Sequence, residues 1–400
     1  MPKILITGNG FDLKHGLPTF YKDFITILSK LKEIKEYNFN NIYSLSANFE
    51  TIRKKYNSEF ELNKENINKL IKLLDENKWF LFFKTELEID SWIDFETKIE
   101  YVLKLVFSSV KHLQENIFNK SPYKIGEIVA KSTLFNNNIE ILEVLNFFKI
   151  IDWYSENGNV VVKENFLYQK YNYNINVNTE KIAEHLYDEI QNFRKIFNLY
   201  FETFVTPLYE NIRDQSINNT FRTINYHFTF NYTPTFQLLY KSEATTNYLH
   251  GKIGENPNLV LGINDIPNDV INKIHYIPFT KYFQKLNENT DFYFLNKIDK
   301  SKPLDYIFFF YGHSLDKSDE DYINEVFDFI NTVDPSRIKK IIVIIHNRES
   351  KARLLSNLIN IRGKDDIVKK MREDILQFIL ADSNELLKEL NSSIDAPIFF

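Results

Sequence analysis

Short unbroken runs of apolar residues constrain the fold of this chain more than any other feature. Such runs cover residues 4–6, 307–310 and 341–345, and they are rich in isoleucine and phenylalanine. Strands with one face in water alternate polar and apolar residues, whereas unbroken runs are typical of strands covered on both faces, as in a parallel sheet. The sequence therefore predicts an α/β fold with a mostly parallel sheet.

The other strand candidates follow residue 222, and helical segments separate them. We expect strands at residues 223–230, 248–250, 259–263, 306–311 and 340–345, a helix at 319–332, and a further helical segment from about 350 to 390. Near the start of the chain, Thr19 is placed to cap a helix with Phe20, Phe24, Ile27 and Leu28 on its apolar face. The predicted sheet is thus split in sequence.

Between these parts the spacing of the apolar residues becomes that of helices. Apolar residues recur every three or four positions within residues 67–74, 92–106 and 182–204. The run 160–162 and the Tyr- and Asn-rich stretch 171–177 fit either a small hairpin or an ordered loop. We therefore expect residues 1–30 and 220–400 to form a split α/β domain, and residues 31–219 to form a large inserted α-helical domain.

Composition excludes several classes of protein. With 44% hydrophobic and 26% charged residues, the chain is typical of an ordered globular protein. It has no cysteine, which excludes disulfide scaffolds and thiol nucleophiles, and its eight histidines show no HExxH pairing, so we predict no metal. The net charge of −5 argues against nucleic acid as a partner.

The sequence also carries signals for location. The apolar run at the N-terminus is too short for a signal peptide. No run approaches the roughly 18 apolar residues of a membrane span. We therefore expect a cytoplasmic protein without membrane contact.

The first chemical motif is the turn after the first predicted strand. Gly8 and Gly10 follow that strand directly, and glycines there let the backbone approach a pyrophosphate, which N–H groups at the next helix attract. The GxGxxG fingerprint needs a third glycine where this chain has Leu13, and the next glycine is Gly16. The turn indicates either a different phosphate-binding loop or a tight turn that needs glycine for its geometry alone.

Several segments resemble the NAD-binding core of the sirtuins. The spacing Gly8-x-Gly10, followed by Gly16-Leu17-Pro18-x-Phe20, is similar to the sirtuin NAD-binding loop. The segments 229–233 (TFNYT), 249–251 (LHG) and 312–315 (GHSL) resemble three further sirtuin segments in the same order, and the second corresponds to the one with the catalytic histidine. This resemblance implies a sirtuin-like, Rossmann-type sheet that binds NAD.

The pattern over the whole chain resembles the AbiH-like abortive-infection family of bacteria. The matching segments are GNGFDLKHGLPTFY at residues 8–21, the residues Trp92, Asp94 and Glu96, the FNYT and HG segments, and GHSL followed by Asp316, Asp319 and Glu320. The resemblance implies an antiphage effector that stops a phage by depleting the NAD of its host. We expect a homo-oligomer, with a phage or host protein as its trigger.

Departures from the sirtuin pattern narrow the implied activity. Asp12 stands where sirtuins have Ser, Tyr21 where they have Arg and Thr233 where they have Asp, and the zinc-binding cysteines are absent. These differences argue against protein deacylation and leave an NAD-hydrolysing core.

The resemblance and the chemistry together suggest roles for Asn231, His250 and Asp12. Loss of nicotinamide creates an oxocarbenium-like ribosyl centre, and nicotinamide leaves as a neutral molecule. Asn231 suits orienting a water or the ribose hydroxyls, and His250 suits taking the proton. Asp12 either stabilises the cationic sugar or binds a ribose hydroxyl; if Asp12 is the base instead, His250 becomes a hydroxyl ligand. The residues expected to bind NAD are Gly8, Asn9, Gly10, Phe11, His15, Pro18, Thr229, Gly251, Gly312 and Ser314.

Other interpretations of these residues stay open. His250 also fits a hydrogen-bonded structural histidine, and Asn231 fits a turn residue. Ser314 and Asp316 also fit caps of the helix expected to begin near Asp319. At the level of function, one alternative is a non-catalytic sensor of NAD or ADP-ribose. Another is a metal-dependent nuclease. Its candidate carboxylates are Asp94, Glu96, Asp316 and Asp319.

Overall fold

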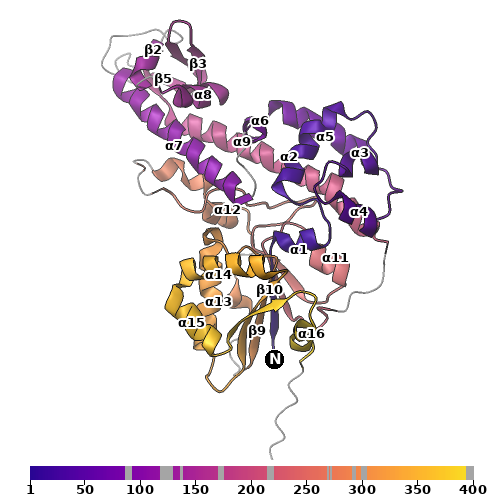
Figure 1. Ribbon diagram of the computed structural model, residues 1–400. Helices are drawn as coiled ribbons and strands as arrows, with labels where there is room; N and C mark the ends of the chain where they lie inside the picture. Colours follow the sequence, from indigo (N-terminus) through magenta and orange to yellow (C-terminus); the bar gives the residue numbers. More distant parts are fainter. Residues whose placement is uncertain are drawn as a thin grey trace, which may run out of the picture. The chain divides into compact units, whose positions relative to one another are not determined.

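The computed structural model describes residues 1–85, 92–117, 129–135, 138–169, 175–213, 220–267, 270, 273–290, 294–298 and 304–392 (Figure 1). Its contacts divide the chain into two compact units. The first, called here the α/β unit, comprises Met1–Ile67, Asn198–Val260 and Lys285–Phe400. The second, called here the helical unit, comprises Asn68–Phe197 and Leu261–Gln284. The domain boundaries expected near residues 30 and 220 stay a prediction.

A six-stranded sheet lies in the α/β unit, in the order β11, β10, β9, β1, β7, β8. Each strand is parallel to its neighbours, and Ile4 of the central β1 lies between Tyr226 and Phe308. The strands are β1 (Lys3–Thr7), β7 (Tyr226–Thr229), β8 (Thr245–Tyr248), β9 (Tyr306–Tyr311), β10 (Lys339–Ile345) and β11 (Leu376–Leu380). The expected α/β fold with a parallel sheet split in sequence is confirmed, and its sirtuin-like character stays a prediction.

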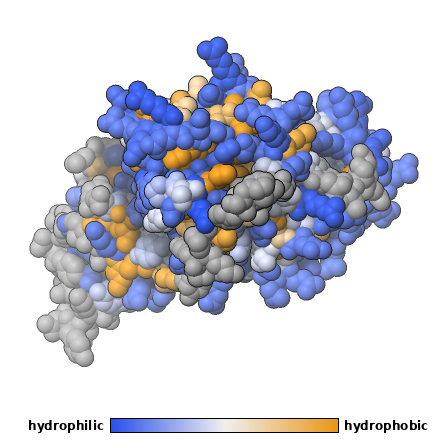
Figure 2. All heavy atoms as spheres, turned by 90° about the horizontal axis from the view of Figure 1, so that it is seen from below, coloured by the Kyte–Doolittle hydropathy of each residue, from blue (hydrophilic) through white to orange (hydrophobic). Residues whose placement is uncertain are grey.

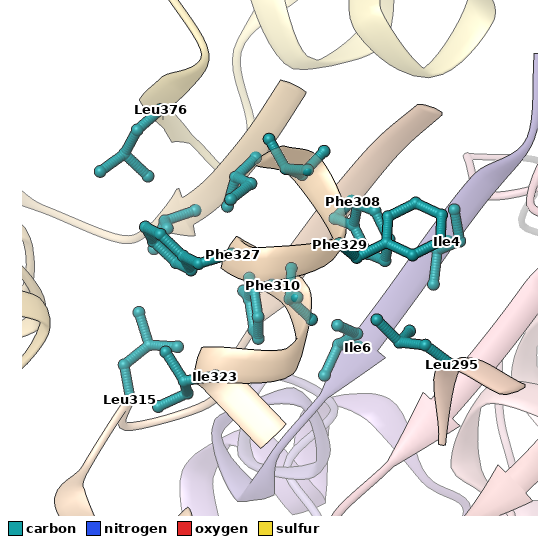
Figure 3. Close-up of a cluster of buried hydrophobic side chains, with 14 of the residues drawn as sticks. Ile4, Ile6, Leu295, Phe308, Phe310, Leu315, Ile323, Phe327, Phe329 and Leu376 are labelled. Atoms are coloured by element: carbon teal, nitrogen blue, oxygen red, sulfur yellow. The ribbon is translucent and has the colours of Figure 1, made fainter. Parts of the chain in front are cut away.

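One face of the sheet is covered by α13 (Glu320–Thr332), α14 (Arg348–Arg362) and α15 (Lys364–Arg372). Alternate strand residues point to this face, as the pleat of a strand requires. Ile6 of β1 and Phe308 of β9 are both fully buried there. Figure 3 shows Phe327 and Phe329 of α13 among the side chains of these strands.

The opposite face carries α1 (Asn9–Lys14), α11 (Thr235–Tyr240) and α16 (Asn384–Asn391). Leu5 and Phe309, which are neighbours in sequence of residues on the first face, enter this second core. Both faces of the central strands are therefore buried, which explains why their sequences lack the alternation of a half-exposed strand.

The remaining helices of the α/β unit are short. They are α2 (Tyr21–Lys30), α3 (Phe39–Tyr43), α4 (Phe49–Lys55) and α10 (Thr206–Glu210). A π-helical turn, Phe201–Val205, directly precedes α10. Single 3₁₀ turns are Leu31–Glu33, Ser132–Phe135, Glu164–Phe166, Lys273–His275, Ile277–Phe279, Leu295–Lys297 and Lys317–Asp319 in the described chain. Three helices run across the division between the units: α5 (Lys64–Glu76), α9 (Thr179–Tyr200) and α12 (Lys281–Asn287).

Aromatic side chains hold the helical unit together. The Trp79 indole donates a hydrogen bond to the Leu186 carbonyl over 3.1 Å, and the Phe95 ring stacks on Phe193 with 5.2 Å between centroids. The unit also contains α6 (Lys78–Thr85), α7 (Trp92–Ile117) and α8 (Ile139–Phe147). The stripes predicted within residues 67–74, 92–106 and 182–204 thus lie on helices.

Two small antiparallel sheets complete the helical unit. One has the order β2 (Val129–Lys131), β4 (Asn159–Val162), β3 (Ile151–Tyr154), and the other pairs β5 (Leu167–Gln169) with β6 (Ile175–Val177). The hairpin interpretation of residues 160–162 is confirmed. Of the stretch 171–177, residues 171–174 lie outside the described residues, and the rest is β6.

Some of the predicted elements are wrong. Residues 259–263 form only an isolated bridge from Ile263 to Thr280. The Val260 N–H donates to the His250 carbonyl and the Leu261 N–H to the Gln284 side chain, so these groups are not paired with a neighbouring strand. The segment 350–390 is interrupted by β11. Thr19 does not cap α2; its hydroxyl donates to Asn9 Oδ1 instead, and Phe20 occupies the cap position.

The surface fits the composition. Figure 2 shows hydrophilic side chains over much of the face seen from below, with hydrophobic side chains between them. Among the helices of the described residues, not one combines the length and the apolar character needed to cross a membrane.

Candidate functional site

The loops that follow β1, β7, β8 and β9 carry most of the residues singled out by sequence. Because these strands are parallel, their carboxyl ends lie at one edge of the sheet. Ligands of open parallel sheets bind at this edge. The edge brings together residues that are more than 200 positions apart, since Asn231 Nδ2 donates to the Gly8 carbonyl over 3.0 Å.

Glycines let the β1 and β9 loops touch through their backbones. The Gly10 N–H donates to the Gly312 carbonyl over 2.8 Å. A Cβ at Gly8 would lie 2.7 Å from the Cα of His313, and one at Gly312 would lie 2.1 Å from the Phe11 nitrogen. Gly312 also has a φ of +69°, which side-chain-bearing residues rarely adopt. The packing of the two loops by itself therefore requires glycine at these positions.

The rest of the first loop is tied into the protein. The Asn9 amide exchanges hydrogen bonds with Thr19, as Nδ2 donates to the Thr19 carbonyl and Oδ1 accepts from its hydroxyl. The Pro18 carbonyl accepts from the Tyr200 hydroxyl over 2.8 Å. The loop is thus held in one conformation by its own polar contacts.

Phe11 and His15 lie in an aromatic cluster beneath this loop. The Phe11 ring packs against Tyr240 and Tyr311, and the His15 Nε2 lies 3.1 Å from the Tyr240 hydroxyl. Burial, followed by the nearby Lys55 and Lys14, lowers the pKa of His15 to about 3. His15 is therefore neutral at physiological pH, and both side chains anchor α1 to the sheet.

Asn231 is held at both its backbone and its side chain. Its N–H donates to Thr229 Oγ1 and its Nδ2 to the Gly8 carbonyl, each over 3.0 Å. The side-chain amide is thereby oriented, with Oδ1 left as an acceptor. Thr229 Oγ1 in turn accepts from the Thr7 hydroxyl, which connects this site to a buried histidine, His227. Burial lowers the pKa of His227 to about 3, so its ring stays neutral.

Asp12 is an almost fully buried carboxyl group next to Asn231. It is 1% exposed, and its Oδ2 accepts a short hydrogen bond from the Thr233 hydroxyl. Within the described residues, Oδ1 has no hydrogen-bond partner. Burial raises the pKa of Asp12 to about 7, and hydrogen bonds from Thr233, Thr235 and Asn231 only partly oppose that rise. A carboxyl that titrates near neutrality can accept or release a proton at physiological pH.

His250 belongs to a cluster that the sequence does not reveal. Its Nε2 lies 3.4 Å from Asp319 Oδ1, and the Nε2 of His313 lies 3.4 Å from Asp319 Oδ2. His313 Nδ1 accepts from the Leu315 N–H over 2.9 Å, so the ring proton of neutral His313 sits on Nε2, facing the carboxylate. The aromatic ring of Phe230 packs against both imidazoles.

The cluster owes its shape to the loop after β9. Leu315 has a φ of 52°, a conformation that bulky residues seldom adopt, and its side chain is fully buried. Backbone strain of this kind is concentrated at functional sites. The sequence signal that was available is GHSL followed by Asp319. From the sequence, Asp319 stands out only as part of the AbiH-like pattern and as a candidate nuclease carboxylate.

The remaining residues singled out by the sequence make backbone and capping contacts within the fold. Gly251 has a φ of +80°, and a Cβ there would lie 1.9 Å from the Asn258 carbonyl oxygen. The exposed Ser314 accepts at its carbonyl from Asn357 Nδ2 over 2.9 Å. Asp316 caps the 3₁₀ turn Lys317–Asp319 by accepting from the Ser318 N–H, so the capping interpretation is confirmed for Asp316.

The carboxylates considered for a nuclease give no metal site in the part of the chain that the structure describes. In the helical unit, Glu96 pairs with Lys281 over 2.7 Å. Across the described ranges, no group of three His, Asp or Glu residues is placed to hold a metal ion. Trp92 begins α7, and its side chain is outside the described residues.

A pocket of about 980 Å³ lies in the α/β unit beside these loops. Its lining residues are Glu202, Thr206, Tyr232, Pro234, Gln237, Thr246, Tyr248, Lys252, Ile253, Gly254, Glu255, Asn258, Asn289 and Thr290. Tyr232 links the pocket to the histidine cluster, since its ring centroid is 6.4 Å from that of His250. The lining includes neither Asn231 nor His250 nor Asp12.

Comparison with known protein families finds one match. The family model described as bacteriophage abortive infection AbiH matches residues 4–339. No curated protein and no solved structure gives a significant match. The matched region contains the candidate site from Gly8 to Asp319.

Proposed function

Because the chain belongs to the AbiH family of bacteriophage abortive-infection proteins, we propose that its α/β unit binds NAD and hydrolyses it to nicotinamide and ADP-ribose. In this proposal the protein is an antiphage effector with a sirtuin-like core. Loss of NAD stops the metabolism of the infected cell, and phage growth stops with it.

The order of the strands supports a dinucleotide site. Numbered along the chain, the six parallel strands lie in the order 3-2-1-4-5-6, the order of the doubly wound folds that bind dinucleotides. Such folds bind their ligand where the strand order reverses, here between β1 and β9. That is the point at which the Gly8 and Gly312 loops touch.

The observation that carries the proposal is the convergence of Asn231, Asp12 and the His250 cluster on this edge. The amide of Asn231 is fixed by Gly8, so its Oδ1 can accept from a water or a ribose hydroxyl. Hydrolysis adds this water to the ribosyl carbon as the bond to nicotinamide breaks, and one proton must be removed from the water. Either His250, next to Asp319, or Asp12, with its pKa of about 7, is suited to take that proton.

Purified full-length protein incubated with NAD tests the proposal. Nicotinamide release is followed by chromatography for the wild type, Asn231→Ala, His250→Ala and Asp12→Asn. We expect the first two variants to lose about 10²-fold or more of the rate, the usual contribution of an orienting or proton-transferring group. His112→Ala, an exposed histidine on α7 of the helical unit, is the matched control and should retain the wild-type rate.

The outcomes separate the open alternatives. Release that survives both Asn231→Ala and His250→Ala would refute the residue assignment. NAD that binds but is recovered intact, both alone and in extracts of phage-infected cells, would favour a non-catalytic nucleotide sensor. If the protein does not bind NAD at all, the proposal of a dinucleotide site is refuted.

A further inference from the structure

We propose that the pocket of about 980 Å³ is a binding site for a nucleoside without phosphate, separate from the NAD site. Its volume is at the upper end of the range that holds small-molecule ligands. This proposal goes beyond the proposed function, because none of Asn231, His250 and Asp12 lines the pocket. Its walls come from the loop after β7, α11, β8, the loop after β8, the π-helical turn with the start of α10, and the residues after α12.

The charges of the lining favour a ligand without phosphate over a phosphorylated one. Glu202 and Glu255 supply two carboxylates, and Lys252 supplies the single ammonium group. Within the described residues, none of these three side chains forms an ion pair with another part of the protein. A phosphate group would meet like charge, whereas a neutral or singly positive ligand would not.

Two tyrosines and an amide provide surfaces for an aromatic base. The Tyr232 hydroxyl donates to the Val260 carbonyl over 3.0 Å, and the Tyr248 hydroxyl to Gln237 Oε1 over 2.9 Å, so both hydroxyls are engaged. Both tyrosines belong to the lining of the pocket. Because Gln237 accepts with Oε1, its Nε2 hydrogens remain as donors for a ligand. Aromatic surfaces with nearby amide donors are suited to stacking and hydrogen bonding of a base.

The polar residues are also suited to a ribose. Carboxylates accept hydrogen bonds from ribose hydroxyls in nucleotide-binding proteins. Glu202 is half-buried, which makes it better placed for this role than the exposed Glu255. Thr206, Thr246 and Asn258 add hydroxyl and amide groups to the same wall. Aromatic surface, amide donors and carboxylate acceptors together describe a nucleoside.

The helix geometry at Glu202 is an independent observation. The helical chain that starts with α9 (Thr179–Tyr200) turns into a π-helix over Phe201–Val205 before it continues as α10. Glu202 lies inside this turn and Thr206 directly after it, and both line the pocket. π-helical turns are rare and occur often at functional sites, because they redirect side chains that a regular helix would place elsewhere.

Calorimetric titration of the full-length protein, in the absence of NAD, tests the proposal. The probes are adenosine, guanosine, cytidine, uridine and nicotinamide riboside, each with its 5′-monophosphate. We expect at least one nucleoside to bind with a stoichiometry of one, and its monophosphate to bind about ten-fold more weakly or worse, because the phosphate meets the carboxylates. Glu202→Gln and Glu202→Lys should weaken the nucleoside by about ten-fold or more.

The controls distinguish this site from the NAD site. Glu210→Lys changes an exposed carboxylate on the same helical segment and should leave the affinity unchanged. Asn231→Ala should also bind the nucleoside normally, whatever its effect on NAD. The proposal is overturned if no probe binds, if the monophosphate binds as tightly as the nucleoside, or if Glu202→Lys has no effect.

Discussion

The polar side chains of the candidate site are almost completely buried. Asp12 is 1% exposed, and Asn231, His250 and His313 are each 7% exposed. Burying such groups is unfavourable unless they are hydrogen-bonded or neutral. Asn231 and His313 have well-placed partners, whereas Asp12 Oδ1 lacks one among the described residues. The protonation of Asp12 is therefore coupled to the stability of the fold.

Asp12→Asn should change how stability depends on pH. The native pKa of about 7 lies above the ordinary 3.8, so between these values the native protein holds a proton that the unfolded chain has lost. Stability from Asp12 is therefore complete below about pH 4 and falls as the pH rises to about 7. We expect the wild type to lose up to about 4 kcal/mol relative to Asp12→Asn across this window. Urea unfolding of both proteins from pH 4 to pH 8 measures it, and parallel pH curves would contradict the expectation.

Asp319→Asn tests the histidine cluster. If Asp319 orients His250 for proton transfer, the variant should lower kcat for nicotinamide release by about 10- to 100-fold with little change in KM. Asp319→Glu should restore part of the rate, because the carboxylate returns. Asp321→Asn, an exposed carboxylate one position into α13, is the control. If Asp319→Asn loses thermal stability while kcat per folded molecule stays unchanged, the role of Asp319 is purely structural.

At the scale of elements, the contact between the β1–α1 and β9–α13 loops determines the shape of the site. Glycine is needed where one backbone passes against another, as Gly312 does against Phe11. The close approach also aligns the carbonyl of Gly8 with the amide of Asn231. A change in either loop is therefore transmitted to the candidate catalytic residues.

Gly312→Ala should be strongly destabilising. Gly363 is its matched control. It has a φ of +80°, but a Cβ placed there would meet no atom of the described residues within 4 Å, apart from its own neighbours in the chain. Both alanine variants bear the strain of a positive φ, about 1 to 3 kcal/mol, and only Gly312→Ala adds a collision with the backbone. We expect Gly312→Ala to cost at least about 2 kcal/mol more than Gly363→Ala in chemical unfolding. Equal costs would show that the loops can move apart freely.

The central strands could be predicted from the sequence, and the edge strands could not. β9 and β10 have unbroken apolar runs because both of their faces are buried. β8 is an edge strand with the sequence TTNY and one buried residue, and β11 is half-exposed and contains Gln377, so neither carries that signal. The convergence of Gly8 and Asn231 followed from the parallel topology. The contact of His250 with Asp319 did not, because it joins side chains from two separate loops whose paths the sequence pattern does not define.

At the scale of the whole molecule, β1 joins the two halves of the sheet. It pairs with β7 on one side and with β9 on the other, and among the described residues no other strand connects β7–β8 to β9–β10–β11. Ile4 and Ile6 are fully buried in one core and Leu5 in the other. The integrity of the sheet therefore depends on a very short segment of chain.

Ile6→Asp should abolish cooperative folding of the α/β unit. Ile6 is fully buried at the centre of the sheet. Burying a charge without a partner there costs more free energy than the total stability of an average domain. Hydrogen exchange followed by mass spectrometry should show loss of protection in β7, β9 and β10. Ile359→Asp, at a residue that is 36% exposed on α14, should retain that protection. Protection that persists in Ile6→Asp would contradict the central role of β1.

The position of β1 also has a consequence during translation. Ile4 leaves the ribosome roughly 220 residues before its partner Tyr226, a delay of about 10 to 40 seconds at ordinary rates of elongation. Throughout that interval the nascent chain carries an apolar β-strand with nothing to pair with, and such segments are the ones that aggregate or attract chaperones. Shielding this early segment until its neighbours are made should therefore raise the yield of folded molecules.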